Sequence, residues 1–299
     1  MNPKTVRSRL KRMFTVKGAF YRTSFAALVI CWTMCALARE GFIDNPKMLP
    51  PKLRPAWDSI FFIKTETTTK IDTGSSFLVS KIIQKEFIDY FFVTNNHVIK
   101  SCPQKGLCPS AILSQNLKIP QKSMSFLDNN DLNGIIFDQV EVLARSKNPD
   151  LALLKVSIPR AKAYDLLPIP LSKSCSLTSG QVLFGMGFPD LNTRKSYVLK
   201  EELPLRKVWS KGVFTENLKS DDNGDENTNY FSATTVDTLD GGSGGALLNS
   251  VGEAVGVMKG NPDNSDGHYE GNEDPEHYDW QSVAVRCELL KEFLNKSMN

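Results

Sequence analysis

Three side chains have the types and positions that nucleophilic catalysis needs. His97 follows an apolar run and the polar residues Thr94–Asn96, Asp150 opens a mostly apolar run, and Ser243 lies among glycines. A serine hydroxyl needs a base to take its proton at neutral pH. Histidine suits that role, since its imidazole titrates at about pH 6.5, and an aspartate can fix its tautomer. Taken singly, His97 would fit a core histidine and Asp150 a turn residue. Their order and strand-end positions together indicate a triad.

The serine lies in the segment Asp240–Gly245, which reads Asp-Gly-Gly-Ser-Gly-Gly and is followed by small apolar residues. Glycines let the backbone turn sharply and direct N–H groups at one point, where an oxyanion would form beside the hydroxyl of Ser243. A glycine-serine run is more often a flexible linker. The catalytic interpretation of this segment therefore depends on His97 and Asp150 upstream.

Several blocks of the chain resemble the trypsin-like (chymotrypsin-fold) serine peptidases. The resemblance runs from about residue 57 to 295 and is closest to secreted bacterial branches, the glutamyl endopeptidases and the HtrA-type proteases. The blocks that carry it are Thr73–Val79, Thr94–Val98, Asp150–Leu154, Gly185–Pro189, Lys211–Val213, Asp237–Thr238, Gly241–Gly245 and Val255–Val257.

This resemblance implies an all-β fold of two antiparallel six-stranded barrels with the active site between them and a C-terminal helix. Barrel one would cover about residues 57–160, barrel two about 175–285, and the helix 286–295. The Pro-rich residues 39–56 are expected to form an extended N-terminal segment. Apolar and alternating runs agree with strands at Ser76–Ile83, Ile135–Leu143, Leu151–Ile158, Gln181–Phe188 and Ala254–Met258. The C-terminal helix would bury Leu289, Leu290, Phe293 and Leu294.

The same resemblance implies a serine endopeptidase that hydrolyses polypeptides through an acyl-enzyme and needs no cofactor. The backbone N–H groups of Gly241 and Ser243 would form the oxyanion hole. The specificity pocket would include Asp237, Thr238, Met258 and Gly260. Asp237 favours cleavage after basic residues. Met258 stands where glutamyl endopeptidases carry the histidine that recognises glutamate, and the preferred substrate residue stays open.

Two other functions compete with this interpretation. The first is a protease-fold protein that binds partners without catalysis, which the complete trio disfavours. The second is a non-peptidase serine acyl hydrolase. Such enzymes carry a Gly-x-Ser-x-Gly elbow with the acid and the histidine after the serine, and neither the spacing nor the order occurs here. The oligomeric state and the physiological substrate cannot be inferred from the sequence.

The N-terminus indicates export. Residues 1–38 hold seven basic residues and no acid, and the apolar run Phe25–Ala38 ends in Ala-Leu-Ala. This order is typical of a secretory signal cleaved after Ala38, and an uncleaved membrane anchor is the alternative. The protein would then be secreted or periplasmic. Without residues 1–38 the chain has 29 basic and 33 acidic residues, a net charge of about −4, so a nucleic-acid partner is not expected.

Four cysteines remain after residue 38, namely Cys102, Cys108, Cys175 and Cys287. An even number in an exported chain indicates disulfides, and four cysteines allow three pairings. Cys102–Cys108 would close a small loop after His97, and Cys175–Cys287 would join the second barrel to the C-terminal helix. Free thiols in a cytosolic protein are the alternative. A zinc site is disfavoured because the Cys-x-x-Cys spacing is absent.

One polar loop, residues 261–279, is rich in carboxylates and would border the substrate cleft. Calcium could bind there, although EF-hand spacing is absent and acidic runs are usually solvated loops. We therefore expect no metal. The side chains concerned are Asp263, Asp266, His268, Glu270, Glu273, Asp274, Glu276, His277 and Asp279.

Overall fold

The structure is a computed structural model that describes residues 43–66, 71–117, 132–189, 206–218, 230–236, 241–260 and 282–298. Three predictions fall outside this part of the chain: the signal segment 1–38, the pocket residues Asp237 and Thr238, and the carboxylates of residues 261–279. Among the described residues, no helix is long and apolar enough to cross a membrane.

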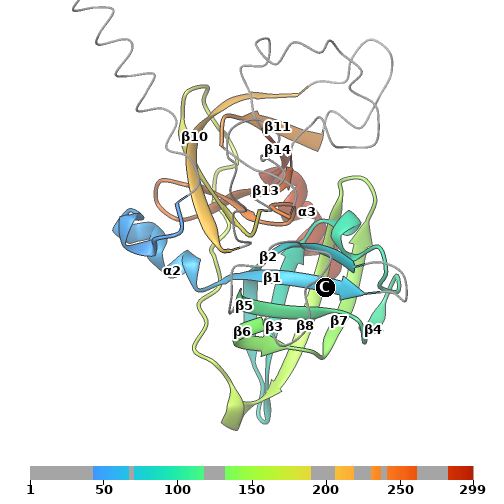
Figure 1. The fold of residues 1–299 in the computed structure, drawn as a ribbon. Helices are drawn as coiled ribbons and strands as arrows, with labels where there is room; N and C mark the ends of the chain where they lie inside the picture. The colour runs from blue at the N-terminus through green and yellow to red at the C-terminus, as the bar shows by residue number, and fades with distance from the viewer. Residues whose placement is uncertain are drawn as a thin grey trace, which may run out of the picture. The chain divides into compact units, whose positions relative to one another are not determined.

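The first half of the body is one antiparallel sheet (Figure 1), whose strands follow the order β4-β7-β8-β3-β2-β1-β5-β6. Its core contains a group of aromatic rings in which Phe61 contacts Phe92 and Phe137, and Tyr90 stacks on Phe137. The strands are β1 (Ile60–Glu66), β2 (Ile71–Ile83), β3 (Phe87–Thr94), β4 (Gly106–Cys108), β5 (Ile112–Leu117), β6 (Leu132–Phe137), β7 (Val140–Ser146) and β8 (Leu151–Pro159).

The second half is a closed six-stranded barrel in the order β10-β11-β14-β13-β12-β9. Alternate residues of its strands fill the interior, among them Leu183, Phe214, Leu247 and Met258. The strands are β9 (Val182–Gly187), β10 (Val208–Asn217), β11 (Phe231–Thr234), β12 (Ala246–Asn249), β13 (Ala254–Gly260) and β14 (Ser282–Arg286).

The predicted all-β class with a six-stranded second barrel and a C-terminal helix is confirmed. The first half differs in detail, because eight strands form it where six were expected. The predicted strand Ile135–Leu143 is interrupted at residues 138–139, which divides it into β6 and β7. A short strand, β4, is added beside β7, and the Cys102–Cys108 disulfide closes the loop that leads into it.

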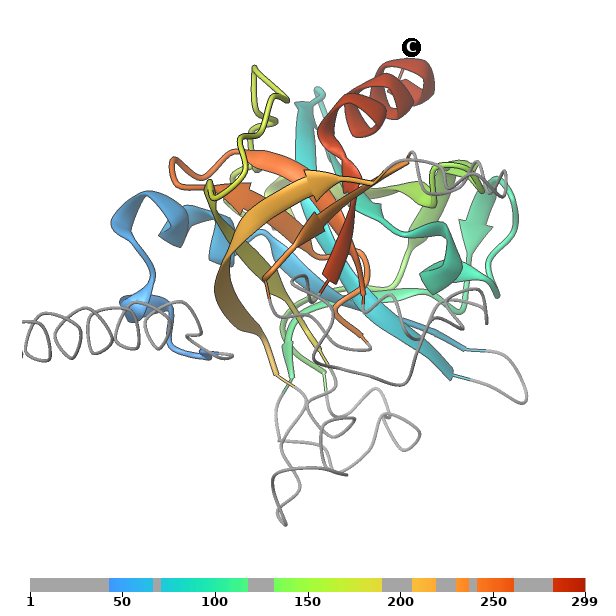
Figure 2. The ribbon, with the colours of Figure 1, turned by 90° about the horizontal axis from the view of Figure 1, so that it is seen from above.

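The C-terminal helix α3 (Cys287–Met298) begins one residue later than predicted and extends three residues further. It buries Leu290, Phe293 and Leu294, as the apolar spacing indicated, and it packs against strands of both halves. Figure 2 shows α3 beside the sheets with the C-terminus at its outer end. Cys287, its first residue, forms a disulfide with Cys175 in the segment that connects the two halves.

The N-terminal segment is not extended, so this expectation was wrong. It forms three short turns, η1 (Pro46–Met48), η2 (Pro51–Leu53) and α2 (Arg54–Trp57), each with a proline in its first positions. Proline pre-sets the helical φ angle and lacks the N–H that the first turn cannot satisfy. Leu49, Leu53 and Ala56 are thereby buried in the core. Ile43 adds a backbone bridge to Trp209 at the start of β10.

Candidate active site

His97 and Asp150 are brought together by the pairing of β3 with β8. Thr94 lies opposite Ala152, so the residues just after β3 and just before β8 reach the same edge of the sheet. His97 lies in the short turn η3 (Asn96–Ile99). Its Nδ1 is 2.5 Å from Oδ2 of Asp150, and its backbone N–H donates to Oδ1 at 2.9 Å. The side chain of Asn95 donates to the carbonyl oxygen of Asp150 at 2.8 Å, which fixes the turn before β8.

Asp150 is buried and still prefers its charged form. Burial raises its pKa, but the hydrogen bonds and charge of His97 and the charge of Lys259 outweigh that effect, so the pKa of Asp150 lies below its ordinary value. An ionised carboxylate only accepts hydrogen bonds, so the proton in the short contact belongs to Nδ1 of His97. In a neutral imidazole held in this way, the other ring nitrogen, Nε2, is the acceptor.

Ser243 lies in the loop before β12 and is almost fully buried. Its hydroxyl donates to the carbonyl oxygen of Lys259 on β13 at 2.6 Å. Among the hydrogen bonds of the described residues, none joins Ser243 directly to His97. The turn of His97 and the loop of Ser243 both pack against Gly74 on β2. A Cβ placed at Gly74 would lie 2.6 Å from the side chain of Val98 and 3.0 Å from the carbonyl oxygen of Ser243. The residue next to His97 and the backbone of Ser243 therefore contact the same point of β2.

Ser75 on β2 holds the serine loop in place from the opposite half of the body. Its backbone N–H donates to the carbonyl oxygen of Ser243, and its hydroxyl donates to that of Gly241, both at 2.8 Å. The backbone N–H of Phe188 completes this group by donating to the Ser75 hydroxyl at 2.8 Å. One small residue thus links the first sheet, the end of β9 and the loop that carries the predicted nucleophile.

The glycines of this loop are required by its geometry. Gly241 and Gly244 have φ angles of +81° and +86°, where a side chain is strained. A Cβ at Gly244 would lie 2.0 Å from the carbonyl oxygen of Ser75 and 2.3 Å from the Thr94 hydroxyl. The N–H of Gly244 donates to the carbonyl of Met258, and the N–H of Met258 donates to that of Gly245. The loop is therefore held against β13 as well as β2.

The predicted specificity residues are only partly described. Asp237 and Thr238 lie outside the described residues, and Gly260 is the last residue of β13. Met258 is buried in the interior of the second barrel, with its sulfur 2.7 Å from the position of a Cβ at Gly185. The ammonium of Lys259 lies 4.5 Å from the centre of the Phe231 ring. Substrate preference stays a prediction.

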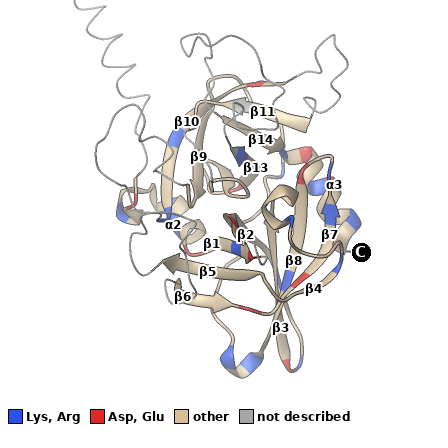
Figure 3. Cartoon of the chain, turned by 45° about the vertical axis from the view of Figure 1, so that its right-hand side comes forward, with Lys and Arg blue, Asp and Glu red and all other residues tan. Residues whose placement is uncertain are grey.

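The sequence also predicted two disulfides, whereas neither a metal site nor a nucleic-acid partner was expected. Both favoured cysteine pairs are formed, Cys102 with Cys108 and Cys175 with Cys287. The described residues hold no cluster of three or more potential metal ligands. Figure 3 shows basic and acidic residues interspersed along the described strands and α3.

Sequence reasoning missed Ser75, which bonds to the loop of Ser243, and Arg145, which bonds to the turn of His97. Ser75 lies within the block Thr73–Val79, but its partner Gly241 is 166 positions away along the chain. The sequence contains no local signal for that contact.

Comparisons with known proteins identify the family and similar folds. A family model described as a trypsin-like peptidase domain matches residues 74–257, a range that includes all three predicted catalytic residues. No curated protein sequence matched the chain.

Two solved structures are similar in fold. A serine endoprotease from Yersinia pestis is 20% identical with a TM-score of 0.50, over 83% of this chain and 65% of that one. A structure of a single-residue variant of the HtrA-type protease AlgW with a tripeptide is 17% identical with a TM-score of 0.52, over 82% of this chain and 62% of that one. This chain therefore spans less than two thirds of the length of either protein.

Proposed function

Because this chain belongs to the trypsin-like peptidase family, we propose that it is an exported serine endopeptidase whose catalytic residues are His97, Asp150 and Ser243. The observation that carries the proposal is the double hydrogen bond between His97 and the buried carboxylate of Asp150. This pair fixes Nδ1 as the protonated ring nitrogen, so that the neutral form of the imidazole offers Nε2 as the base that a serine nucleophile needs.

In the proposed reaction, the Ser243 hydroxyl turns from the Lys259 carbonyl toward Nε2 of His97. Its oxygen attacks the peptide carbonyl while Nε2 takes its proton, and Asp150 stabilises the imidazolium that forms. The backbone N–H groups of Gly241 and Ser243 would donate to the resulting oxyanion. His97 then gives the proton to the leaving amine, and water hydrolyses the acyl-enzyme by the same steps in reverse order.

A catalytically silent binding protein is the second candidate, and one observation favours it. The Ser243 hydroxyl donates to the Lys259 carbonyl, and a hydroxyl that stayed there would not be activated by His97. The two candidates differ in whether Ser243 can be acylated.

Labelling with a fluorophosphonate probe separates the two candidates. We expect the natural protein to be labelled covalently at Ser243, and Ser243→Ala and His97→Ala to abolish labelling. Ser232→Ala is the matched control, since it removes another buried hydroxyl, which donates to Asn217 on the neighbouring strand. Absence of labelling in the natural protein would favour the silent candidate, and labelling that persists in Ser243→Ala would place the nucleophile elsewhere.

Export is tested by the N-terminal residue and the free thiols of the protein recovered outside the cytoplasm. We expect it to begin at Arg39 and to contain no alkylatable thiols, because the cysteines after residue 38 form two disulfides. Intact mass before and after alkylation without reduction measures both properties. An intact N-terminus would indicate a retained anchor, and four alkylated thiols would contradict the oxidising compartment.

A further inference from the structure

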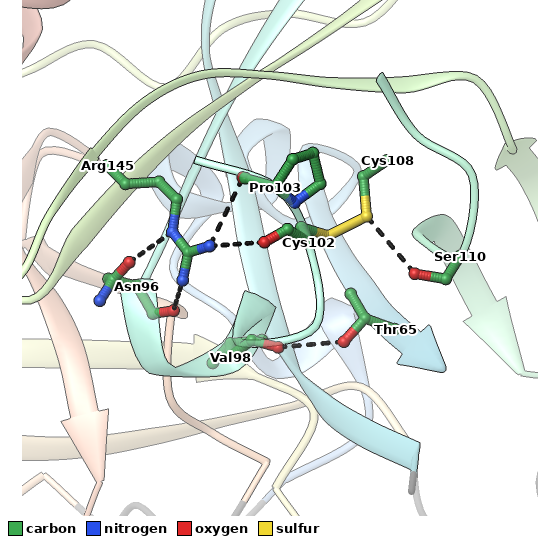
Figure 4. The surroundings of a disulfide bond; sticks show 8 residues. All are labelled: Thr65, Asn96, Val98, Cys102, Pro103, Cys108, Ser110 and Arg145. Atoms are coloured by element: carbon green, nitrogen blue, oxygen red, sulfur yellow. Dashed lines mark hydrogen bonds between the residues drawn. A yellow bond between two sulfur atoms is a disulfide. The ribbon is translucent and has the colours of Figure 1, made fainter. Parts of the chain in front are cut away.

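Arg145 on β7 makes four hydrogen bonds around the turn that carries His97 (Figure 4). Its Nε donates to the side-chain oxygen of Asn96 at 2.6 Å, and one terminal nitrogen donates to the carbonyl of Asn96 at 3.4 Å. The other terminal nitrogen donates to the carbonyls of Cys102 at 2.7 Å and Pro103 at 3.4 Å. A single guanidinium therefore holds the residue before His97 and the chain that leaves its turn.

The register of the sheet explains why Arg145 reaches this turn. Ala152 on β8 pairs with Thr94 on one side and with Arg145 on the other, which brings Arg145 close to the end of β3. The pairing of β7 with β8 shifts between Val142 and Ala144. Such a bulge re-aims the side chains that follow it.

The turn η3 needs support from outside. It has four residues, and the side chain of its N-cap residue, Asn95, makes no capping hydrogen bond. The amide NH₂ of Asn95 donates to Asp150, while its buried side-chain oxygen has no hydrogen-bond partner. The Thr65 hydroxyl donates to the carbonyl of Val98, at a long 3.4 Å. The Cys102–Cys108 disulfide closes the loop that follows the turn. Arg145 is the group that joins this closed loop to Asn96.

Arg145 also brings charge to the pair formed by His97 and Asp150. Burial lowers the pKa of Arg145 and the charge of Asp150 raises it, with a net lowering from its ordinary value. Arginine remains protonated in proteins under all ordinary conditions. Within the part of the chain that the structure describes, the cations other than His97 that interact electrostatically with Asp150 are Arg145 from β7 and Lys259 from β13.

We propose that Arg145 is a positioning residue for His97, which fixes the imidazole through its fork of hydrogen bonds to Asn96, Cys102 and Pro103. The inference rests on the proposed function, since it assigns a role in the same reaction. Arg145 would act on His97 in two ways, through the geometry of its hydrogen bonds and through its positive charge, and the two are tested separately.

Kinetics test the geometry. We expect Arg145→Met and Arg145→Lys to lower kcat for a peptide substrate roughly 10- to 100-fold, with KM within about twofold, because small displacements of a catalytic group cost rates of this order. Rates are expressed per active site titrated with fluorophosphonate. Arg54→Met is the matched control, since Arg54 also donates to two backbone carbonyls, those of Leu49 and Lys47, and lies in the N-terminal turns.

The pH profile tests the charge. Arg145→Met removes a cation that interacts with Asp150. Protonation of the His97–Asp150 pair as a whole should then become easier, so the acid limb of kcat/KM should move upward by roughly half a pH unit. Arg145→Lys keeps the charge and should leave that limb in place. This difference between the two variants is one that loss of stability alone would not produce.

Proton NMR on a Ser243→Ala background tests the same inference without activity. The chain has three histidines, so the ring signals of His97 can be assigned with one further variant. We expect a low-field Nδ1–H signal from the bond to Asp150, and we expect both Arg145 variants to broaden it. If Arg145→Met does not fold, Asn96→Ala removes the shortest contact from the other side and should broaden the signal as well.

The outcomes are distinct. If the natural protein neither labels nor hydrolyses peptides, the proposed function fails, and the Nδ1–H signal still decides whether Arg145 positions His97. Folded variants with an unchanged signal, an unchanged acid limb and kcat within twofold would overturn the inference, even if their Tm is lower. Broadening in Arg54→Met to the same extent would overturn it too.

Discussion

Asp150→Asn is expected to lower kcat for peptide hydrolysis about ten-thousandfold near pH 7, the loss known for a triad whose geometry is kept but whose histidine tautomer is wrong. The backbone N–H of His97 donates to one carboxylate oxygen of Asp150, and Nδ1 contacts the other. In the variant, the amide oxygen must face that backbone N–H, so the NH₂ group faces Nδ1. Nδ1 then becomes an acceptor, and Nε2 carries the proton that it should be free to take.

Asp89→Asn is the control for this variant. Asp89 and Asp150 are each 8% exposed, but Asp89 bonds to Ser157 and Gln84, away from the site. The same loss of charge there should leave kcat within a few-fold. Stopped assays with a peptide substrate measure both variants per fluorophosphonate-titrated site. A kcat for Asp150→Asn within tenfold of the natural protein would show that Asp150 does not set the tautomer of His97.

The second large effect concerns Lys207, a buried lysine just before β10. Its ammonium donates to the carbonyl of Trp57 at 2.9 Å and lies about 5.5 Å from the rings of Trp57 and Phe188. Burial lowers its pKa from 10.5 to about 7, and the charge of Asp58 opposes this effect without overcoming it. The unfolded chain therefore binds a proton at this lysine between about pH 7 and 10.5, where the folded protein does not.

We expect the free energy of unfolding to rise with pH across that interval, by about 1.4 kcal/mol per pH unit from this group alone. Below pH 7 the cost of the buried charge is fully present, and above pH 10.5 it is absent. Lys207→Met removes this titration. The free energy of unfolding of the variant minus that of the natural protein should therefore be greatest near pH 7, and this difference should fall by roughly 4–5 kcal/mol toward pH 10.5.

Urea unfolding at a series of pH values measures this difference, with Ser243→Ala in every protein to prevent self-digestion. Lost contacts of Lys207, such as the hydrogen bond to Trp57, shift the difference by a constant and do not change its slope. Lys81→Met is the control, because the Lys81 ammonium is paired with Asp165 near the surface. A stability difference for Lys207→Met that stays flat with pH would show that Lys207 is charged in the folded protein.

The predicted triad could be found from the sequence because each member lies at the end of a strand that is itself readable. Apolar runs locate β3 and β8, and their antiparallel pairing then brings His97 and Asp150 to one edge. The glycines around Ser243 also indicate the loop's conformation in advance, because Gly241 and Gly244 adopt positive φ angles that favour glycine.

The parts that could not be predicted depend on contacts between distant segments. Lys207 precedes an ordinary strand, and its burial arises only because Trp57 and Phe188 cover it. Arg145 resembles any polar residue of an exposed strand until the bulge in β7 directs it at Asn96. Residues 39–56 were expected to be extended from their prolines. In the described part of this segment, Leu49 and Leu53 gain more by packing on the core.

The disulfide between Cys175 and Cys287 makes a covalent ring of the chain from the connecting segment to the start of α3. Every strand of the second barrel and Ser243 belong to this ring, whereas His97 and Asp150 lie on the chain before it. A single cut anywhere between residues 176 and 286 opens the ring without releasing a fragment. A peptidase that nicked its own loops there would keep its mass, apart from one added water, until the disulfide was reduced.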